Sequence, residues 1–144
     1  YKGRKETGVL LGRMLGKRLR ESGLYTDIDF VAAVPLHPLK HWSRGYNQAG
    51  IIAEAVAREL GVKVLKGALR RRSFTATQTS KNAQERWSNV SGVFRLARRR
   101  DVENRHILLV DDVLTTGATL ETCGHALLEA EGCKVSVATL AFVE

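Results

Sequence analysis

The chain lacks most features that mark disulfide-stapled or membrane-spanning proteins. Its 144 residues include only two cysteines and two prolines. No apolar run approaches the roughly 20 residues that a membrane-spanning helix needs. Two isolated cysteines, Cys123 and Cys133, more often pack as small apolar side chains than bind metal. We therefore expect a cytoplasmic protein with no membrane partner. No secretory signal is visible in the sequence. Because Tyr1 is not a natural start, we expect that an N-terminal segment of the natural chain is missing.

Acidic residues are also scarce. The sequence has 15 Asp and Glu against 23 Lys and Arg, which gives a formal net charge of +8. A basic surface favours polyanionic partners, so nucleic acid and a phosphate-rich small molecule are both candidates. The run Arg98–Arg100 is expected to form a solvated turn. The length predicts a single domain over residues 1–144, large enough to bury a sizeable core.

Helical and strand-like patterns alternate along the chain. Apolar residues recur at helical spacing over residues 6–22, from after 47 to about 60, and over 120–131. Strand-like apolar runs occupy 30–34, 62–65, 92–96, 107–110 and 134–142. This alternation predicts an α/β fold with a mainly parallel central sheet flanked by helices. Residues 70–89 are polar and lack periodicity, so we expect a long loop there.

The most informative stretch is 107–119. Four apolar residues run into Asp111 and Asp112, and a Thr/Gly-rich turn follows before a helical pattern begins. The apolar run suits a strand buried on both faces, and open α/β sheets bind ligands beyond the carboxyl ends of their strands. Carboxylates accept the paired hydrogen bonds of a sugar diol. A helix start attracts phosphate, and Gly117 permits backbone conformations closed to other residues. The alternative is a purely structural strand-to-helix turn capped by Thr119.

This stretch resembles the phosphoribosyl pyrophosphate (PRPP) motif of type I phosphoribosyltransferases, and nearly the whole chain resembles the ComF family. The family resemblance rests on sequence at 1–4, 34–38, 44–49, 77–78, 86, 89–90 and 92–94. Members often carry a cysteine-rich, zinc-binding N-terminal segment, which this sequence lacks. The resemblance implies the type I phosphoribosyltransferase fold, with a flexible loop that closes over the site.

The resemblance also implies a role for each part of the site. Asp111 and Asp112 would be the catalytic acids that hold the ribose hydroxyls. The 5′-phosphate would bind at Thr115, Thr116, Gly117, Ala118 and Thr119. The pyrophosphate would bind at Pro35, Leu36, His37, Lys40 and Arg44. The flexible loop over 70–87 would contribute Arg71, Arg72 and Lys81. The alternatives are that the prolines only stiffen a turn and that the loop cations are solvated.

The function implied by the resemblance is transfer of a phosphoribosyl group from Mg–PRPP to a nitrogenous acceptor, with release of pyrophosphate. Mg²⁺ would be held mainly by PRPP and water rather than by direct protein ligands. Thr115 replaces the Asp of 6-oxopurine salvage enzymes, and Thr116 replaces the Arg of glutamine-dependent amidotransferases. The acceptor is therefore not identified.

A second hypothesis comes from the charge and from aromatic residues among basic ones, which can stack bases. In this reading the protein is a non-catalytic PRPP- or nucleic-acid-binding accessory in DNA uptake or repair. The sequence leaves open whether two copies of the chain form a homodimer.

Overall fold

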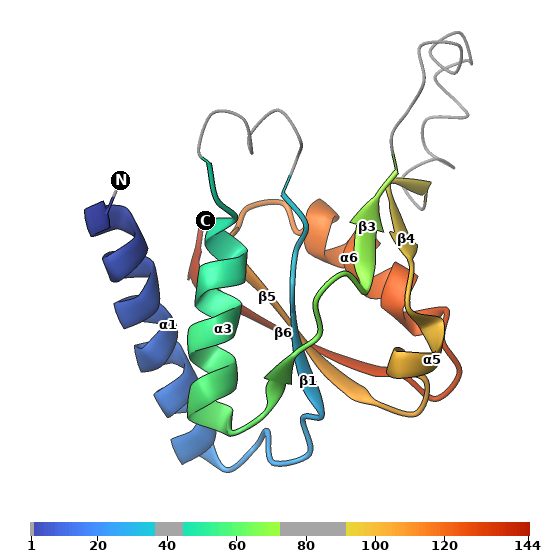
Figure 1. Cartoon of the computed structure of the whole chain (residues 1–144), viewed down its shortest axis with the longest axis horizontal. Helices are drawn as coiled ribbons and strands as arrows, with labels where there is room; N and C mark the ends of the chain where they lie inside the picture. The colour runs from blue at the N-terminus through green and yellow to red at the C-terminus, as the bar shows by residue number, and fades with distance from the viewer. Residues whose placement is uncertain (1, 37–44, 73–91) are drawn as a thin grey trace, which may run out of the picture.

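The protein is described by a computed structural model that covers residues 2–36, 45–72 and 92–144 (Figure 1). Its main sheet is entirely parallel, in the order β2-β1-β5-β6. The four strands are β1 (Phe30–Ala33), β2 (Lys63–Val64), β5 (His106–Leu114) and β6 (Lys134–Phe142). The helices are α1 (Lys2–Ser22), α3 (Gln48–Leu60), α5 (Arg99–Val102) and α6 (Ala118–Leu128). A small antiparallel sheet pairs β3 (Leu69–Arg71) with β4 (Phe94–Leu96).

The strand β5 is the centre of the fold. The residues 107–110 are each 0% exposed, because apolar layers cover both faces of the sheet. Ile107 and Leu109 pack with α6 and the β3–β4 sheet, whereas Leu108 and Val110 pack against α3. Figure 1 shows α1 and α3 on one side of the sheet and α6 with β3 and β4 on the other. The predicted α/β fold with a mainly parallel, helix-flanked sheet is therefore confirmed.

Two local predictions are wrong. Arg70 and Arg71 do not lie in a loop, because they belong to β3 and pair with Arg95 and Phe94 of β4. A three-residue strand is too short to produce a visible alternation in the sequence, and its stability comes from the nonlocal pairing. The run Arg98–Arg100 is not a simple turn either. It leads into α5, and Arg98 Nε lies 2.6 Å from Asp101 Oδ2.

Other boundaries agree closely with the patterns. The helix α3 ends at Leu60, where Gly61 adopts a left-handed conformation with φ +69°, a common helix stop. Thr119 lies in the first turn of α6, as predicted. The strand β5 extends beyond the predicted end at 110 and contains Asp111 and Asp112. Within the described ranges, no helix is both long and apolar enough to cross a bilayer.

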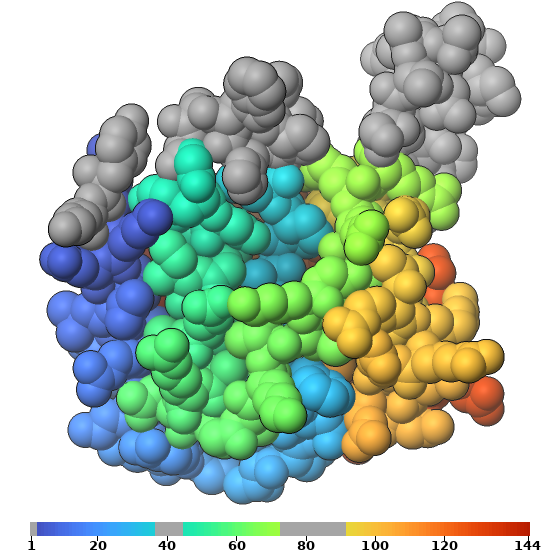
Figure 2. All heavy atoms as spheres, in the orientation of Figure 1, coloured from blue at the N-terminus to red at the C-terminus, as the bar shows by residue number. Residues whose placement is uncertain are grey.

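Glycines allow α1 to pack closely against α3, and the two helices lie in contact along their length (Figure 2). Gly8, Gly12 and Gly16 are spaced four residues apart and are all buried. A Cβ atom on Gly12 would lie 2.8 Å from the Cβ of Ala55 and 3.0 Å from the carbonyl oxygen of Ile52. A Cβ atom on Gly16 would lie 2.7 Å from the Cβ of Glu59, so side chains at Gly12 and Gly16 would force the two helices apart.

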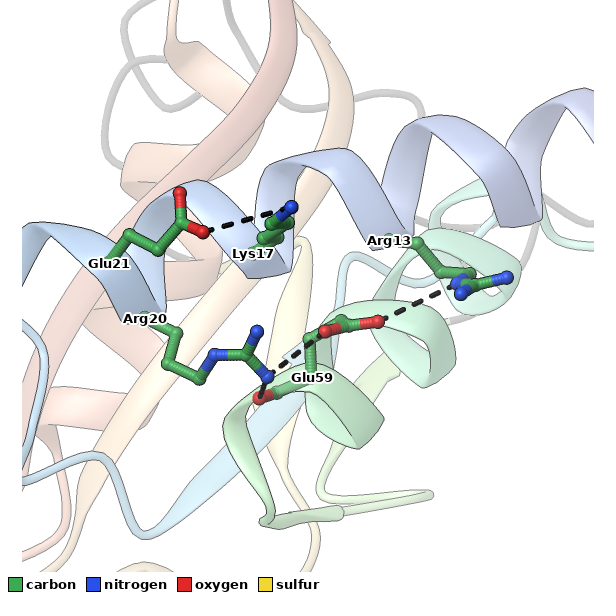
Figure 3. Close-up of polar contacts among 5 residues, drawn as sticks. All are labelled: Arg13, Lys17, Arg20, Glu21 and Glu59. Atoms are coloured by element: carbon green, nitrogen blue, oxygen red, sulfur yellow. Dashed lines mark hydrogen bonds and ion pairs between the residues drawn. The ribbon is translucent and has the colours of Figure 1, made fainter.

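Charged residues at the rim of the α1–α3 contact complement the glycine stripe (Figure 3). Glu59 of α3 receives two arginines of α1: Arg13 Nε lies 3.5 Å from Oε1 and Arg20 Nη1 lies 3.2 Å from Oε2. Arg20 also donates to the Glu59 carbonyl oxygen at 3.2 Å. These pairs are partly exposed, so they fix the orientation of α1 more than they stabilise it.

The glycine contact gives a first prediction. We expect Gly12→Ala to destabilise the protein by about 1–3 kcal/mol, the usual range for overpacking, although alanine favours a helix by ~1 kcal/mol. Gly124→Ala in α6 is the matched control, because no atom of the described residues lies within 4 Å of its added Cβ. Urea denaturation measures both. Equal stabilisation by the two substitutions would contradict the close packing.

A second polar network joins the amino ends of β5 and β6. His106 Nε2 lies 2.8 Å from Ser136 Oγ, and its Nδ1 lies 3.0 Å from Asp27 Oδ1. The backbone N–H of His106 donates to Asp29 Oδ2 at 2.8 Å. The hydrogen bond from His106 is the main cause that lowers the pKa of the Asp27 carboxyl below its ordinary 3.8.

This network gives a pH-dependent prediction. A carboxyl whose pKa is lower in the folded than in the unfolded chain stabilises the fold above the unfolded value. The contribution of Asp27 is therefore present above pH 3.8 and is lost as the pH falls through the folded-state pKa. NMR titration of the Asp27 carboxyl should give a midpoint below 3.8, and His106→Leu should return it toward that value. A midpoint at or above 3.8 in the unmodified protein would refute the network.

Candidate functional site

The two adjacent acids lie at the carboxyl edge of the sheet. The strand β1 ends beside Val110, where the N–H of Val34 donates to the Val110 carbonyl oxygen at 3.0 Å. Asp111 and Asp112 therefore continue past the end of β1 while β5 is still paired with β6. Both acids are half-buried, and Asp111 Oδ1 accepts a 2.9 Å hydrogen bond from the Asp112 backbone N–H.

The strand alternation directs the two acids to opposite faces of the sheet. Successive side chains of a strand point to opposite sides, and Leu108 and Val110 face α3. Asp112 continues that series, whereas Asp111 follows Leu109 on the α6 side. In agreement, Asp111 lines a small concavity with 113–120, and Asp112 is not among the lining residues.

The turn after β5 presents free backbone donors at the start of α6. Gly117 is the N-cap residue and has φ +82°, a left-handed conformation that favours glycine. Among the described residues no side chain caps the first turn of α6, so Thr119 does not cap the helix as the structural alternative supposed. The Ala118 N–H has only a long 3.4 Å contact with Thr116 Oγ1. The turn residues Thr115, Thr116, Ala118 and Thr119 are exposed, and together with the helix dipole they suit an anion.

The segment after β1 lies next to the acids. Pro35 and Leu36 are half-buried, directly after the Val34–Val110 hydrogen bond. Asn47 Nδ2 donates to the Val34 carbonyl oxygen at 3.2 Å, so the start of α3 holds the end of this strand. The remaining predicted pyrophosphate residues, His37, Lys40 and Arg44, lie outside the described residues.

Arg71 occupies a fixed strand position rather than a place on a closing loop. Its guanidinium carbon lies 4.9 Å from the ring centroid of Phe94, its cross-strand partner. Within the described part of the chain, the buried Nε of Arg71 has no hydrogen-bond partner. Arg72 is exposed, and its backbone N–H donates to the Val93 carbonyl oxygen at 2.8 Å. Lys81 lies outside the described residues.

Cys123 connects Arg71 to the motif, which the sequence patterns did not predict. Burial, the largest cause, and the charge of Asp111 raise the pKa of the Cys123 thiol to about 12, while the charge of Arg71 acts to lower it. Asp111 and Arg71 therefore both lie within electrostatic reach of Cys123. Cys123 is 0% exposed and belongs to the core beneath the motif. It packs as an apolar side chain, as expected. No three His, Cys, Asp or Glu side chains converge as a metal site in the described ranges, so the cofactor remains a prediction.

Several known proteins are similar to this chain in sequence or in fold. A family profile described as the phosphoribosyl transferase domain matches residues 47–144. The chain belongs to this family. The DNA utilization protein YhgH of Escherichia coli strain K12 is 36% identical over 129 residues, which are 90% of this chain and 55% of that protein. Competence protein F of Haemophilus influenzae is 37% identical over 100 residues, which are 69% of this chain and 44% of that protein. The predicted membership of the ComF family is confirmed.

The ComF-family chain spans about half the length of the curated relatives it matches. Among solved structures, the glutamine PRPP amidotransferase from B. subtilis, complexed with ADP and GMP, superimposes with a TM-score of 0.67. That match has 22% sequence identity and covers 94% of this chain and 26% of the other. At this identity the similarity establishes the type I phosphoribosyltransferase fold and nothing about the substrate.

The left-handed turn gives a prediction for this site. A side chain costs ~1–2 kcal/mol in a left-handed conformation, and Gly117→Ala can relieve that strain by moving the turn. We expect about tenfold weaker binding of ribose 5-phosphate, measured by calorimetry. Gly23→Ala is the matched control, because Gly23 has φ +67° and lies at the end of α1. If both variants bind ribose 5-phosphate equally well, the turn does not hold the phosphate.

Proposed function

We propose that this ComF-family protein binds Mg–PRPP and transfers its phosphoribosyl group to a nitrogenous acceptor with release of pyrophosphate. One observation carries the proposal. Asp111 and the exposed turn 115–119 line the same concavity at the carboxyl edge of the sheet. A carboxylate that can accept hydrogen bonds from a diol and a helix start that can bind an anion therefore lie side by side, as a sugar phosphate requires.

The two carboxylates suit the sugar at the moment of reaction. Asp111 and Asp112 would accept hydrogen bonds from the 2′- and 3′-hydroxyls and offset positive charge as the bond to pyrophosphate breaks. The acceptor nitrogen donates its electron pair to the anomeric carbon, and the pair of the broken C–O bond leaves with pyrophosphate. The proton of the acceptor nitrogen passes to pyrophosphate or water. Arg71 and Arg72 are proposed to offset the charge of pyrophosphate, Arg71 from its fixed place on β3.

Mg²⁺ fits the donor set around this edge. It prefers oxygen ligands and keeps several waters, and the described acids at the edge are the two carboxylates of the motif. When bound, the ion would neutralise the charge of pyrophosphate as it leaves. Pro35 and Leu36, with His37, Lys40 and Arg44, are proposed to line the pyrophosphate side of the same edge.

The acids give the central test. Asp111→Asn with Asp112→Asn keeps the shape of both side chains but removes their charges, and charge-assisted hydrogen bonds contribute about 1.5–3 kcal/mol each. We expect at least ~100-fold weaker binding of Mg–PRPP, measured by calorimetry, with a nearly unchanged melting temperature. Asp101→Asn, in the short helix α5 that precedes β5, is the control. An unchanged affinity of the double variant for Mg–PRPP would contradict the ribose-binding role. A large fall in its melting temperature would support a structural role for the acids.

A second candidate is a non-catalytic PRPP- or nucleic-acid-binding accessory. The relatives named for DNA utilization and competence favour it, as does the exposed basic face of α1. That face includes Arg4, Lys5, Arg13, Lys17 and Arg18. Of the aromatic residues near basic ones, Tyr46 is described, and Lys5 Nζ lies 5.2 Å from its ring centroid.

Salt dependence and pyrophosphate release separate the two candidates. If the protein binds single-stranded DNA, the affinity for oligo(dT) should fall with salt, with a slope of about −0.7 per neutralised phosphate on logarithmic axes. Fluorescence anisotropy measures this slope. Pyrophosphate release from PRPP with any amine or nucleobase acceptor would favour the enzyme. An affinity for oligo(dT) that is insensitive to salt would contradict the nucleic-acid role of the basic face.

A further inference from the structure

The middle of α1 is apolar on all sides. Residues 9–15 read Val-Leu-Leu-Gly-Arg-Met-Leu, and Arg13 is the one charged residue among them. A helix that is hydrophobic all round is normally buried all round. Here α1 packs mainly on α3 and touches β6, and Figure 1 shows it as the outermost helix on its side of the molecule. One side of this apolar segment is therefore uncovered by the described part of the chain.

The uncovered side of α1 is opposite its glycines. Gly8, Gly12 and Gly16 contact α3, and Leu11 lines a cavity of ≈ 310 Å³ between α1, the start of α3 and the carboxyl end of β6. The remaining side, here called the outer face, carries Leu10 and Met14, which are 58% and 57% exposed. Each lies about 200° around the helix from the nearest glycines, so both side chains point away from the body of the molecule.

A hollow on the outer face suits an inserted side chain. It has a volume of ≈ 320 Å³ and is lined by Lys5, Glu6, Val9, Leu10 and Arg13. Residues 6, 9, 10 and 13 are spaced as i, i+3, i+4 and i+7. Four residues in this arrangement form the hole that receives a side chain of a facing helix when two helices pack side by side. The shape of the outer face therefore fits a second helix.

The charges of the outer face match those of a second copy of the same helix. The face carries Glu6, Lys17, Arg18 and Glu21, two acids and two bases, although the whole chain has a charge of +8. Lys17 Nζ lies 3.8 Å from Glu21 Oε1. Within the described ranges, Glu6 and Arg18 have no ion-pair partner. One end of the face therefore offers an unpaired acid and the other end an unpaired base.

We infer that two copies of this chain associate through the outer faces of their α1 helices, which pack as an antiparallel pair. A twofold axis beside residue 12 places Leu10 opposite Met14 of the second copy and Glu6 opposite Arg18 of the second copy. Because a twofold interface is self-complementary, each contact occurs twice. Met14 of each copy faces the hollow of the other, and methionine fills irregular gaps well. A parallel pair would instead place Glu6 beside Glu6.

A membrane surface fits this face less well than a second copy does. Helices that lie on anionic membranes carry mainly Lys and Arg on their polar side, whereas acids and bases are equal in number on the outer face. The two arginines on the neighbouring flank of α1 already pair with Glu59. The mixture of charges around a short apolar centre is therefore that of a helix–helix contact.

The antiparallel arrangement keeps both candidate sites open. The amino end of α1 lies near the carboxyl edge of the sheet, since Arg4 and Thr7 line the same cavity as Leu140. Antiparallel α1 helices therefore direct the carboxyl edges of the two sheets toward opposite ends of the dimer. The turn into α6 lies on the other side of the sheet from α1 (Figure 1), so the contact leaves it uncovered.

The chain offers matched variants for a test. Leu10→Gln removes an apolar side chain from the outer face, and Leu128→Gln makes the same change in α6, where Leu128 is 52% exposed. Glu6→Lys and Arg18→Glu each place like charges opposite one another, and the double variant restores opposite charges. Glu131→Lys is the control for added positive charge, because Glu131 is exposed after the end of α6.

Sedimentation velocity over a range of protein concentrations measures the association of the 144-residue chain. We expect a dimer with a dissociation constant in the micromolar range, because one pair of helices buries less surface than a standard interface. Leu10→Gln, Glu6→Lys and Arg18→Glu should each raise this constant at least about tenfold. Leu128→Gln and Glu131→Lys should leave it unchanged. Circular dichroism at dilute concentration should give all variants the melting temperature of the unmodified protein.

The double variant Glu6→Lys with Arg18→Glu is the decisive measurement. The two residues lie about 18 Å apart along one helix, so association regained by the double variant requires contact between copies. A double variant that associates no better than the single variants would overturn the antiparallel pair. A chain that stays monomeric at millimolar concentration, or equal weakening by Leu10→Gln and Leu128→Gln, would overturn the inference. Binding of the monomer to phosphatidylglycerol vesicles that Leu10→Gln abolishes would assign the outer face to a membrane instead.

Discussion

Burial of β5 on both faces is the constraint on which the rest of the structure depends. Because 107–110 are fully buried, polar side chains are excluded from the middle of the sheet and accumulate where β1 ends and β5 continues. Asp111 and Asp112 occupy this point, and the turn into α6 follows immediately. The hydrophobic core thereby places the acids and the backbone donors of the turn at one edge.

The helix α1 packs mainly on α3, and its Leu15 and Leu19 also pack against the core on that side of the sheet. The glycines of α1 allow the backbones of α1 and α3 to approach closely. The two arginines on Glu59 then fix how α1 lies along α3. This placement sets the cavity wall beside β6. Because the glycines of α1 carry no side chains, they set how closely α1 approaches α3, and this approach determines the shape of the cavity between α1, α3 and β6.

Much of the architecture could be predicted because its signals are local. The apolar run at 107–110, the Gly61 stop and the 134–142 strand are each set by neighbouring residues, and the structure has them as predicted. The strand β3 could not be predicted, because three residues carry no usable period and their pairing partner lies more than twenty residues away. The sequence therefore predicts a loop at Arg71, whereas in the structure Arg71 lies in β3 and packs on Phe94.

The sequence by itself determined the chemistry of the motif, since Asp111, Asp112 and the Gly117 turn are adjacent in the chain and their backbone geometry is local. Only the tertiary structure decided to which face of the sheet each acid points and which residues from distant parts of the chain lie near the acids. Strand alternation separates Asp111 from Asp112. Packing of α6 brings Cys123 within the electrostatic influence of both Asp111 and Arg71, and the α1–α3 contact brings Arg4 and Gln48 to Leu140. Such contacts depend on the close approach of helices and strands that are far apart in the sequence, which no local sequence pattern encodes.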